Sequence, residues 1–328
     1  MTWTSAVLPV LAGALLAYFG LKLLVPVLVS RAILDHPEDR RNHETPTPRG
    51  GGLAVVGAVL IVWLYFVPDR TEAAFLAFWF GAVVLTAVSF LDDMRRLGAP
   101  VRFAVQAAAV ALALWAGPGL PDIAGVPGWA VAIAVGFLWV WFVNLFNFMD
   151  GIDGIAGVEA IAVAFGGALC LALAGHAHVA QAMALTIVGA ALAFLAFNWH
   201  PARVFMGDSG SIPLGFMLGG LLVALLATPF WAAAVILPAY YWIDSGITIL
   251  WRLKDGERVW TPHSRHAYQK AVRRGWRHDR VALTIAAFNL VMIALAVVSP
   301  AAPIICAAVG LGLALVLFAV LSGMGARQ

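Results

Sequence analysis

Three aspartates in two short polar stretches are the first candidates for chemistry. Asp92 and Asp93 are adjacent in "LDDMRR", and Asp208 lies among glycines and hydroxyls in "FMGDSGS". Adjacent carboxylates repel each other, which raises one pKa unless a cation lies between them. Carboxylate and hydroxyl oxygens are also the ligands that Mg²⁺ prefers. These stretches therefore predict a site for a divalent cation and a phosphate, with Asp92 or Asp93 as a candidate base.

Both stretches also have a structural alternative. Asp92 and Asp93 could form a solvated helix end that pairs with Arg95 and Arg96. Asp208, or a serine beside it, could cap the helix that follows, because aspartate and serine are preferred at that position. The sequence leaves these alternatives open.

The stretch "NLFNFMDGIDG" places amides and carboxylates at a spacing of three residues: Asn144, Asn147, Asp150 and Asp153. On a helix such residues share a face, and the glycines allow the backbone to approach a ligand closely. The set could hydrogen-bond a nucleobase or a ribose, or bind Mg²⁺ through oxygen. The alternative is a helix cap with Asp-Gly turn chemistry, although two amides in an apolar run are costly without partners.

A basic stretch and a histidine stretch complete the polar set. Arg40, Arg41, His43 and Arg49 precede three glycines in "DRRNHETPTPRGGG". Arginine forks suit phosphate, but the same loop could be a basic anchor on the inner side of a membrane.

In "TPHSRHAYQ", His263 and His266 flank Arg265. A zinc site would need a further ligand at suitable spacing, and the sequence offers none. Contacts with an anion and a sugar therefore fit this stretch better. Asp244, in "YYWIDSG", is a carboxylate within an apolar region whose role is open.

The elements that must position these residues are membrane helices. The chain has 328 residues, of which 62% are hydrophobic and 11% charged, against about 25% charged in soluble domains. Apolar stretches of about the length that crosses a bilayer recur throughout. We expect an all-α polytopic integral membrane protein with about eleven transmembrane helices, or ten if the stretch 210–250 is a single span. The expected spans are 5–30, 51–67, 73–91, 101–117, 128–148, 158–175, 179–198, 210–227, 230–250, 281–299 and 302–322.

The basic residues predict how these helices are oriented. Of the 20 lysines and arginines, Arg70 lies on one side and Lys22 within the first span, which leaves 18 on the other side. Because basic loops stay in the cytoplasm, we expect an N-terminus outside and the candidate site on the cytoplasmic face. The loops on that face are 31–50, 92–100, 149–157, 199–209 and 251–280. Aspartates, arginines and a lipid-embedded body together suggest phosphoryl-type transfer from a soluble nucleotide to a lipid.

The motifs resemble one known family, the polyprenyl-phosphate N-acetylhexosamine-1-phosphate transferases (glycosyltransferase family 4). The resemblance lies in "HETPTPRGGG", "LDDMRRL", "VRFAVQ", "NLFNFMDGIDGIAG", "FMGDSGS" and "PHSRHAYQ", which occur in the family order. It implies a single transferase domain over residues 1–328. It also implies attack of a polyprenyl (undecaprenyl) phosphate on a UDP-N-acetylamino sugar such as UDP-GlcNAc, with release of UMP and a requirement for Mg²⁺, or Mn²⁺ in its place.

The resemblance also implies roles for individual residues. Asp92 and Asp93 match the acidic pair near the lipid phosphate, and which of them acts as base is left open. Asp208 matches the magnesium-binding aspartate, with Asp92 as a second candidate ligand. The remaining candidates are Asn144, Asn147, Asp150, Asp153, His263, Arg265 and His266 for the nucleotide and sugar, and Arg49, Arg102 and His43 for phosphate.

Two departures indicate a branch of the family. His263-Ser-Arg-His266 stands where the peptidoglycan branch has adjacent histidines, and Asn42-His43 stands where that branch has a lysine. Both favour the branch that initiates O-antigen, lipopolysaccharide or other cell-wall polysaccharides at the bacterial inner (cytoplasmic) membrane. A phospho-MurNAc-pentapeptide transferase is the alternative, and an ion-coupled secondary transporter is the alternative of another class. We expect membrane lipid as a partner and no nucleic acid, and a homodimer is among the oligomeric states allowed.

Overall fold

The computed structural model describes residues 3–35, 46–67, 71–95, 97–175, 179–258, 261 and 263–324, and nearly all of its ordered elements are helices. The helices are α1 (Trp3–Ser30), α2 (Gly52–Phe66), α3 (Ala73–Arg95), α4 (Ala99–Ala116), α5 (Gly128–Phe148), α6 (Ile155–Leu173), α7 (Val179–Asn198), α8 (Asp208–Leu225), α9 (Ala233–Ile236), α10 (Ala239–Lys254), α11 (Ala267–Arg273), α12 (His278–Val298), a 3₁₀ turn at Ser299–Ala301, and α13 (Pro303–Ser322). Two short strands, β1 (Leu34–Asp35) and β2 (Thr47–Pro48), pair antiparallel. The all-α prediction is confirmed.

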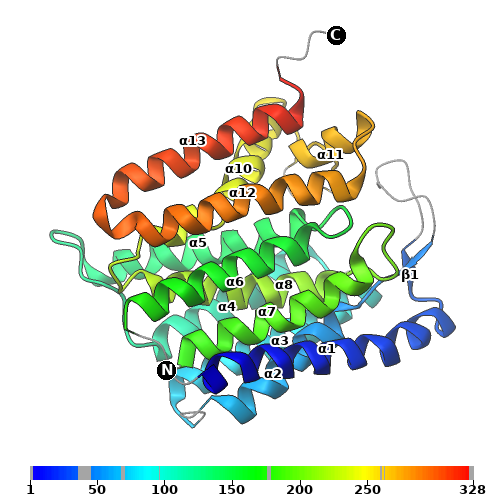
Figure 1. The fold of residues 1–328 in the computed structure, drawn as a ribbon, viewed down its shortest axis with the longest axis horizontal. Coiled ribbons are helices and arrows are strands. Elements are labelled where there is room, and N and C mark those ends of the chain that lie inside the picture. The colour runs from blue at the N-terminus through cyan, green and yellow to red at the C-terminus, as the bar shows by residue number, and fades with distance from the viewer. Residues whose placement is uncertain are drawn as a thin grey trace.

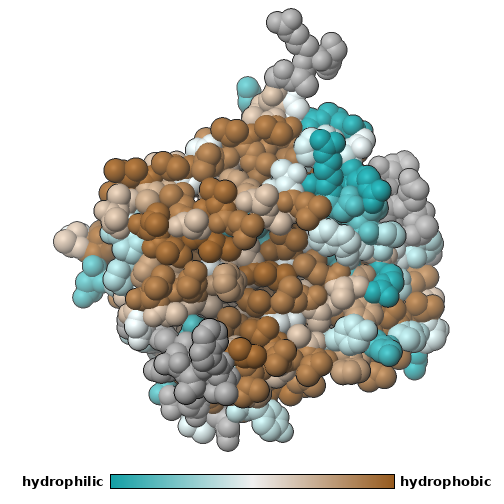
Figure 2. Space-filling model, in the orientation of Figure 1, coloured by the Kyte–Doolittle hydropathy of each residue, from teal (hydrophilic) through white to brown (hydrophobic). Residues whose placement is uncertain are grey.

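The surface of the helical body is apolar, as a lipid environment requires. Leu23, Phe137, Leu290 and Ile304, on four different helices, are 74%, 67%, 69% and 74% exposed. Figure 2 shows apolar side chains across the middle of the molecule and polar ones gathered toward the end at which β1 and α11 lie in Figure 1. Since soluble monomers rarely expose apolar patches of this extent, the chain is a multi-pass membrane protein.

The interior is built around α6, α7 and α8, most of whose residues are buried. α1 and α2 pack against α7, while α3 and α5 pack against α8 (Figure 1). Small residues allow these close approaches, as is common between membrane helices. The first turn of α8 is therefore enclosed by helices that are distant from it in the sequence.

One expected span differs from its prediction. The stretch 230–250 forms two helices, α9 and α10, with Pro238 between them at φ −92° and ψ 24°. Proline has no backbone N–H to continue a helix, which explains the break. Within the described part of the chain, nine helices are long and apolar enough to cross a membrane, and α2 is apolar but shorter. The number of crossings and their direction stay predictions.

The segment before α2 is fastened to the segment before α8. Arg49 forms an isolated parallel bridge with Phe205, and the N–H of Gly51 donates to the carbonyl of Phe205 at 2.9 Å. A Cβ at Gly52 would lie 2.2 Å from the Cα of Gly210, so the two backbones touch. This contact brings Arg49 to the start of α8.

Candidate active site

Asp93 and Asp208 share one arginine. Asp93 lies near the end of α3 and Asp208 begins α8. The Nη2 atom of Arg49 is 2.9 Å from Oδ1 of Asp93 and 2.6 Å from Oδ1 of Asp208. The N–H of Ser209 donates to Oδ2 of Asp93 at 3.2 Å. The Asp93 carboxylate therefore lies at the positive end of α8, where negative charge is stabilised.

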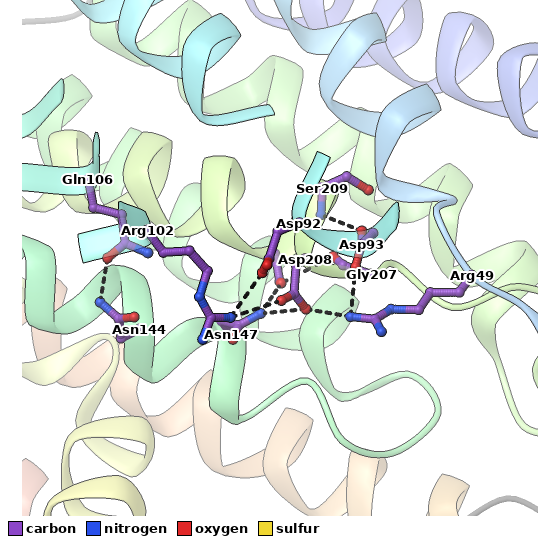
Figure 3. Close-up of polar contacts among 11 residues, drawn as sticks. Arg49, Asp92, Asp93, Arg102, Gln106, Asn144, Asn147, Gly207, Asp208 and Ser209 are labelled. Carbon is purple, nitrogen blue, oxygen red and sulfur yellow. Dashed lines mark hydrogen bonds and ion pairs between the residues drawn. The ribbon is translucent and has the colours of Figure 1, made fainter. Parts of the chain in front are cut away.

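Asp92 and Asp208 meet a second arginine. The Nη1 atom of Arg102, in the first turn of α4, is 3.0 Å from Oδ2 of Asp92 and 3.7 Å from Oδ2 of Asp208. The amide nitrogen of Asn147 donates to Oδ1 of Asp208 at 3.2 Å and to Oγ of Ser211 at 2.7 Å. Figure 3 shows the two guanidiniums approaching the carboxylates from opposite sides.

We call Asp92, Asp93, Asp208, Arg49 and Arg102 the acidic centre. The three aspartate side chains are 7%, 11% and 19% exposed, whereas both arginines are 34% exposed. The carboxylates are thus enclosed while the guanidiniums reach solvent, from which a phosphate can approach them. An oxygen-only ligand set such as Asp92 and Asp208 fits Mg²⁺ or Mn²⁺.

The structure contains neither the solvated helix end nor the helix cap that the sequence allowed for these aspartates. Asp92 is buried and pairs with Arg102, so it is no solvated helix end. Gly207, not Asp208, is the N-cap of α8, and no side chain caps it. Arg40, Arg41, His43 and Arg96 lie outside the described residues.

The polar face expected from "NLFNFMDGIDG" does not form. α5 ends at Phe148, so Asp150 and Asp153 lie in the loop between α5 and α6. Asn144 is buried, and its amide nitrogen donates to Oε1 of Gln106 at 2.7 Å and to the carbonyl of Val140 at 2.7 Å. Of the expected set, Asn147 hydrogen-bonds to the acidic centre, and Asp150 lies close enough to interact with the charges of Asp208 and Arg49.

The two loop aspartates have different surroundings. Burial, together with the nearby charge of Asp208, raises the pKa of Asp150 to about 7. Asp153 instead receives bonds from His200 and His278, which outweigh its burial and lower its pKa. The two carboxylates therefore do not act as a pair. Sequence reasoning missed both histidines, and the only signal was the position of His200 in the loop before "FMGDSGS".

The histidine loop is anchored by Asp244. His266 is the N-cap of α11, and its Nδ1 lies 3.1 Å from Oδ1 of Asp244. The same carboxylate accepts the N–H of Ala267 at 3.0 Å and the hydroxyl of Tyr240 at 2.7 Å. The hydroxyl of Tyr268 donates to the carbonyl of Phe148 at 3.1 Å. Asp244 thus holds the start of α11 against α10, while Tyr268 ties α11 to the end of α5.

The other two residues of this loop are less suited to hold a diphosphate in the described conformation. Arg265 already pairs with Asp255 at 2.7 Å and with Glu257. Burial, then the charges of His266 and Arg252, lowers the pKa of His263 to about 3. His263 is therefore neutral near pH 7 and offers a hydrogen bond rather than a positive charge. The binding roles of these residues stay predictions.

Comparison with known proteins places this chain in a family. The family model for glycosyl transferase family 4 matches residues 75–226. A decaprenyl-phosphate N-acetylglucosaminephosphotransferase of Mycobacterium tuberculosis is 30% identical over 322 residues, which cover 84% of this chain and 78% of the relative. The chain belongs to glycosyl transferase family 4.

Two further relatives of this glycosyl transferase carry different names. A probable undecaprenyl-phosphate N-acetylglucosaminyl 1-phosphate transferase of Bacillus subtilis is 29% identical over 290 residues, covering 80% of this chain and 77% of the relative. A phospho-N-acetylmuramoyl-pentapeptide-transferase of Geobacillus kaustophilus is 29% identical over 283 residues, covering 77% of this chain and 84% of the relative. The family match itself contains Asp92, Asp93 and Asp208 but neither Arg49 nor the histidine loop.

Removal of the Asp244 carboxylate is expected to loosen this glycosyl transferase at α11. Asp244→Ala leaves His266 and the first N–H groups of α11 without their acceptor, and each buried donor left unpaired costs about 1–3 kcal/mol. We expect a lower midpoint of thermal unfolding and easier cleavage of the 255–275 segment by protease. Ser245→Ala, a buried change on the same helix, is the control. Equal cleavage of both variants would contradict the anchoring role.

The Asp150 carboxyl predicts a pH-dependent stability. Because its pKa is raised to about 7, the folded protein keeps this proton where the unfolded chain has lost it, and stability falls as pH rises from about 4 to about 7. Asp150→Asn removes this effect. We expect its melting temperature, relative to that of the wild-type protein, to be higher at pH 8 than at pH 5. A difference that is the same at both pH values would contradict the raised pKa.

Proposed function

We propose that this glycosyl transferase moves an N-acetylamino-sugar 1-phosphate from a UDP-sugar to a polyprenyl phosphate of the inner membrane. The observation that supports it most is the acidic centre, three enclosed carboxylates and two arginines at one end of an apolar helical body. A lipid phosphate can reach such a site from the bilayer and a nucleotide from the polar side. The names of the relatives from Bacillus and Mycobacterium support GlcNAc as the sugar.

In the proposed reaction an oxygen of the lipid phosphate attacks the β-phosphorus of the UDP-sugar. A new P–O bond forms, the bond from that phosphorus to the bridging oxygen breaks, and UMP leaves. Arg49 and Arg102 hold phosphate oxygens, because their guanidiniums are the solvent-facing cations of the centre. Asp92 or Asp93 orients the attacking phosphate and accepts any proton that it carries. Such fixed charges around developing charge are usually the largest contribution to catalysis.

The proposed metal is Mg²⁺, with Mn²⁺ as a substitute, and Asp208 and Asp92 would hold it. When bound, it would neutralise phosphate charge and so favour departure of UMP. Contacts within the chain already orient both carboxylates. Asn147 and Arg49 hold that of Asp208, and Arg102 holds that of Asp92.

The nucleotide would lie toward the loop between α5 and α6 and toward α11. Asp150 is proposed to bind the uridine or ribose, and its raised pKa allows it to donate or accept a hydrogen bond near pH 7. Tyr268 ties α11 to the end of α5, so the histidine loop and the Asp150 loop would bind one substrate together. The product would initiate O-antigen or another cell-envelope polysaccharide.

The test is a donor panel on the purified protein in lipid nanodiscs. UDP-GlcNAc, UDP-GalNAc, UDP-glucose and UDP-MurNAc-pentapeptide are each supplied with undecaprenyl phosphate, with and without Mg²⁺, and UMP and the lipid product are identified by mass. We expect UMP and a polyprenyl-diphosphate-GlcNAc only with metal. No UMP from any donor would overturn the proposal.

The second candidate function is transfer of phospho-MurNAc-pentapeptide, which the Geobacillus relative's name favours. The same panel separates the two, because only one donor carries the peptide. A transporter would instead give counterflow of solute in proteoliposomes with no UMP.

A further inference from the structure

A second polar cluster lies outside the acidic centre, where two histidines converge on Asp153. The Nδ1 atom of His200 is 2.7 Å from Oδ2 of Asp153, and the Nδ1 atom of His278 is 3.3 Å from the same oxygen. The three potential ligand atoms all lie within 4.8 Å of one another. The side chains of Asp153 and His278 are 6% and 7% exposed and that of His200 is 28% exposed. The cluster is therefore enclosed on one side and open to a small ligand on the other.

The three residues come from separate parts of the chain. Asp153 lies in the α5–α6 loop, His200 in the α7–α8 loop and His278 at the start of α12. Asn198 braces this arrangement, since its Oδ1 accepts the N–H of Gly154 at 2.8 Å. Three side chains from separate segments therefore converge and are held by backbone contacts. This arrangement is typical of a binding site rather than of an accidental contact at the surface.

The Nδ1 atom of His278 has two neighbours at similar distances. It lies 3.4 Å from the backbone nitrogen of Asp153 and 3.3 Å from Oδ2 of the same residue. The imidazole nitrogen and the carboxylate oxygen both carry a lone pair that a cation can accept. His200, beside the same oxygen, adds a third ligand atom.

We propose that Asp153, His200 and His278 bind a divalent transition metal of the zinc class. Two imidazole nitrogens and one carboxylate, with an open position, match the ligand sets of zinc and related metals. The oxygen-only acidic centre suits Mg²⁺ instead, so the two sites differ in the metal that they select. This site does not depend on the proposed transferase reaction.

The metal would act as a clamp on the substrate loop. It would join the α5–α6 loop to the α7–α8 loop and to α12. Its ligand on the α5–α6 loop, Asp153, lies three residues after Asp150. Because a ligand that binds only the folded state stabilises it, zinc is expected to raise the midpoint of thermal unfolding by several degrees.

The test uses the full chain in detergent, stripped with EDTA and titrated with Co²⁺ as a spectroscopic probe. Asp208→Asn serves as the background, so that the oxygen-only site contributes little. We expect about one equivalent of Co²⁺ with visible ligand-field absorption, displaced by Zn²⁺ and unaffected by excess Mg²⁺. His200→Gln in this background is expected to weaken binding at least about tenfold.

Asp279→Asn, next to His278 but outside the cluster, is the matched control and is expected to bind Co²⁺ unchanged. His200 is the most exposed of the three residues, so its variant is the least disruptive, and a monodisperse chromatographic profile checks its folding. Absence of ligand-field absorption in the protein that retains all three cluster residues would overturn the proposal. Equal affinity in His200→Gln would overturn it as well.

Discussion

Asp208→Asn is expected to lower transferase turnover by roughly 10²–10³-fold while the helices stay assembled. Asparagine keeps the shape of the side chain but removes the charge that Arg49 and Arg102 both face. The acidic centre then has one negative charge fewer beside its two arginines, and the proposed Mg²⁺ site loses a charged ligand. We expect the Mg²⁺ concentration for half-maximal activity to rise as well. Initial rates of UMP release over a Mg²⁺ series measure both effects.

The control for this variant is Asp122→Asn, in the exposed loop between α4 and α5. It makes the same chemical change away from the acidic centre and is expected to leave the rate and the Mg²⁺ dependence unaltered. Melting curves show whether Asp208→Asn is still folded. A folded Asp208→Asn protein with activity within about threefold of the wild-type rate would remove Asp208 from the proposed site.

Gly52→Ala is expected to cost stability and activity together. The added methyl group would lie 2.2 Å from the Cα of Gly210, a backbone atom that no side-chain rotation can move away. Overpacking of this kind costs about 1–3 kcal/mol. The relief must come from separation of α2 and α8, which carries Arg49 away from Asp208. Since a displacement of about 1 Å at a reacting centre can cost about 10²-fold in rate, we expect a loss of that order in kcat/KM.

Gly57 offers a matched control on the same helix, because a Cβ there meets nothing within 4 Å. Gly57→Ala is expected to be neutral or to stabilise by up to about 1 kcal/mol, since alanine favours helix. Thermal melting and UMP release on both variants make the comparison. If the two alanines behave alike, then the contact between α2 and α8 does not position Arg49.

The helices and the membrane setting could be predicted from the sequence because their causes are local. A bilayer demands about 20 apolar residues per span, and each expected span has a helix over the same stretch, with a division only at Pro238. The aspartates at 92, 93 and 208 could likewise be singled out by residue type and spacing.

Pairing between distant residues could not be predicted in this way. Helical periodicity placed Asn144, Asn147, Asp150 and Asp153 on one face, but α5 ends at Phe148 and the loop turns Asp150 and Asp153 into different surroundings. The sequence showed no partner for His200 or His278; the packing of two loops and the start of α12 brings both to Asp153. Such contacts depend on how the helices pack, not on local pattern.

The sequence by itself therefore determined the class of protein, the positions of the helices and the resemblance to a transferase family. Each of these follows from composition, segment length or short motifs. Only the tertiary structure decided that Arg49 and Arg102 share Asp208, that Asp244 anchors α11, and that Asp153 belongs with two histidines. The physical reason is that charge pairing and desolvation act through space, between residues that the chain holds far apart.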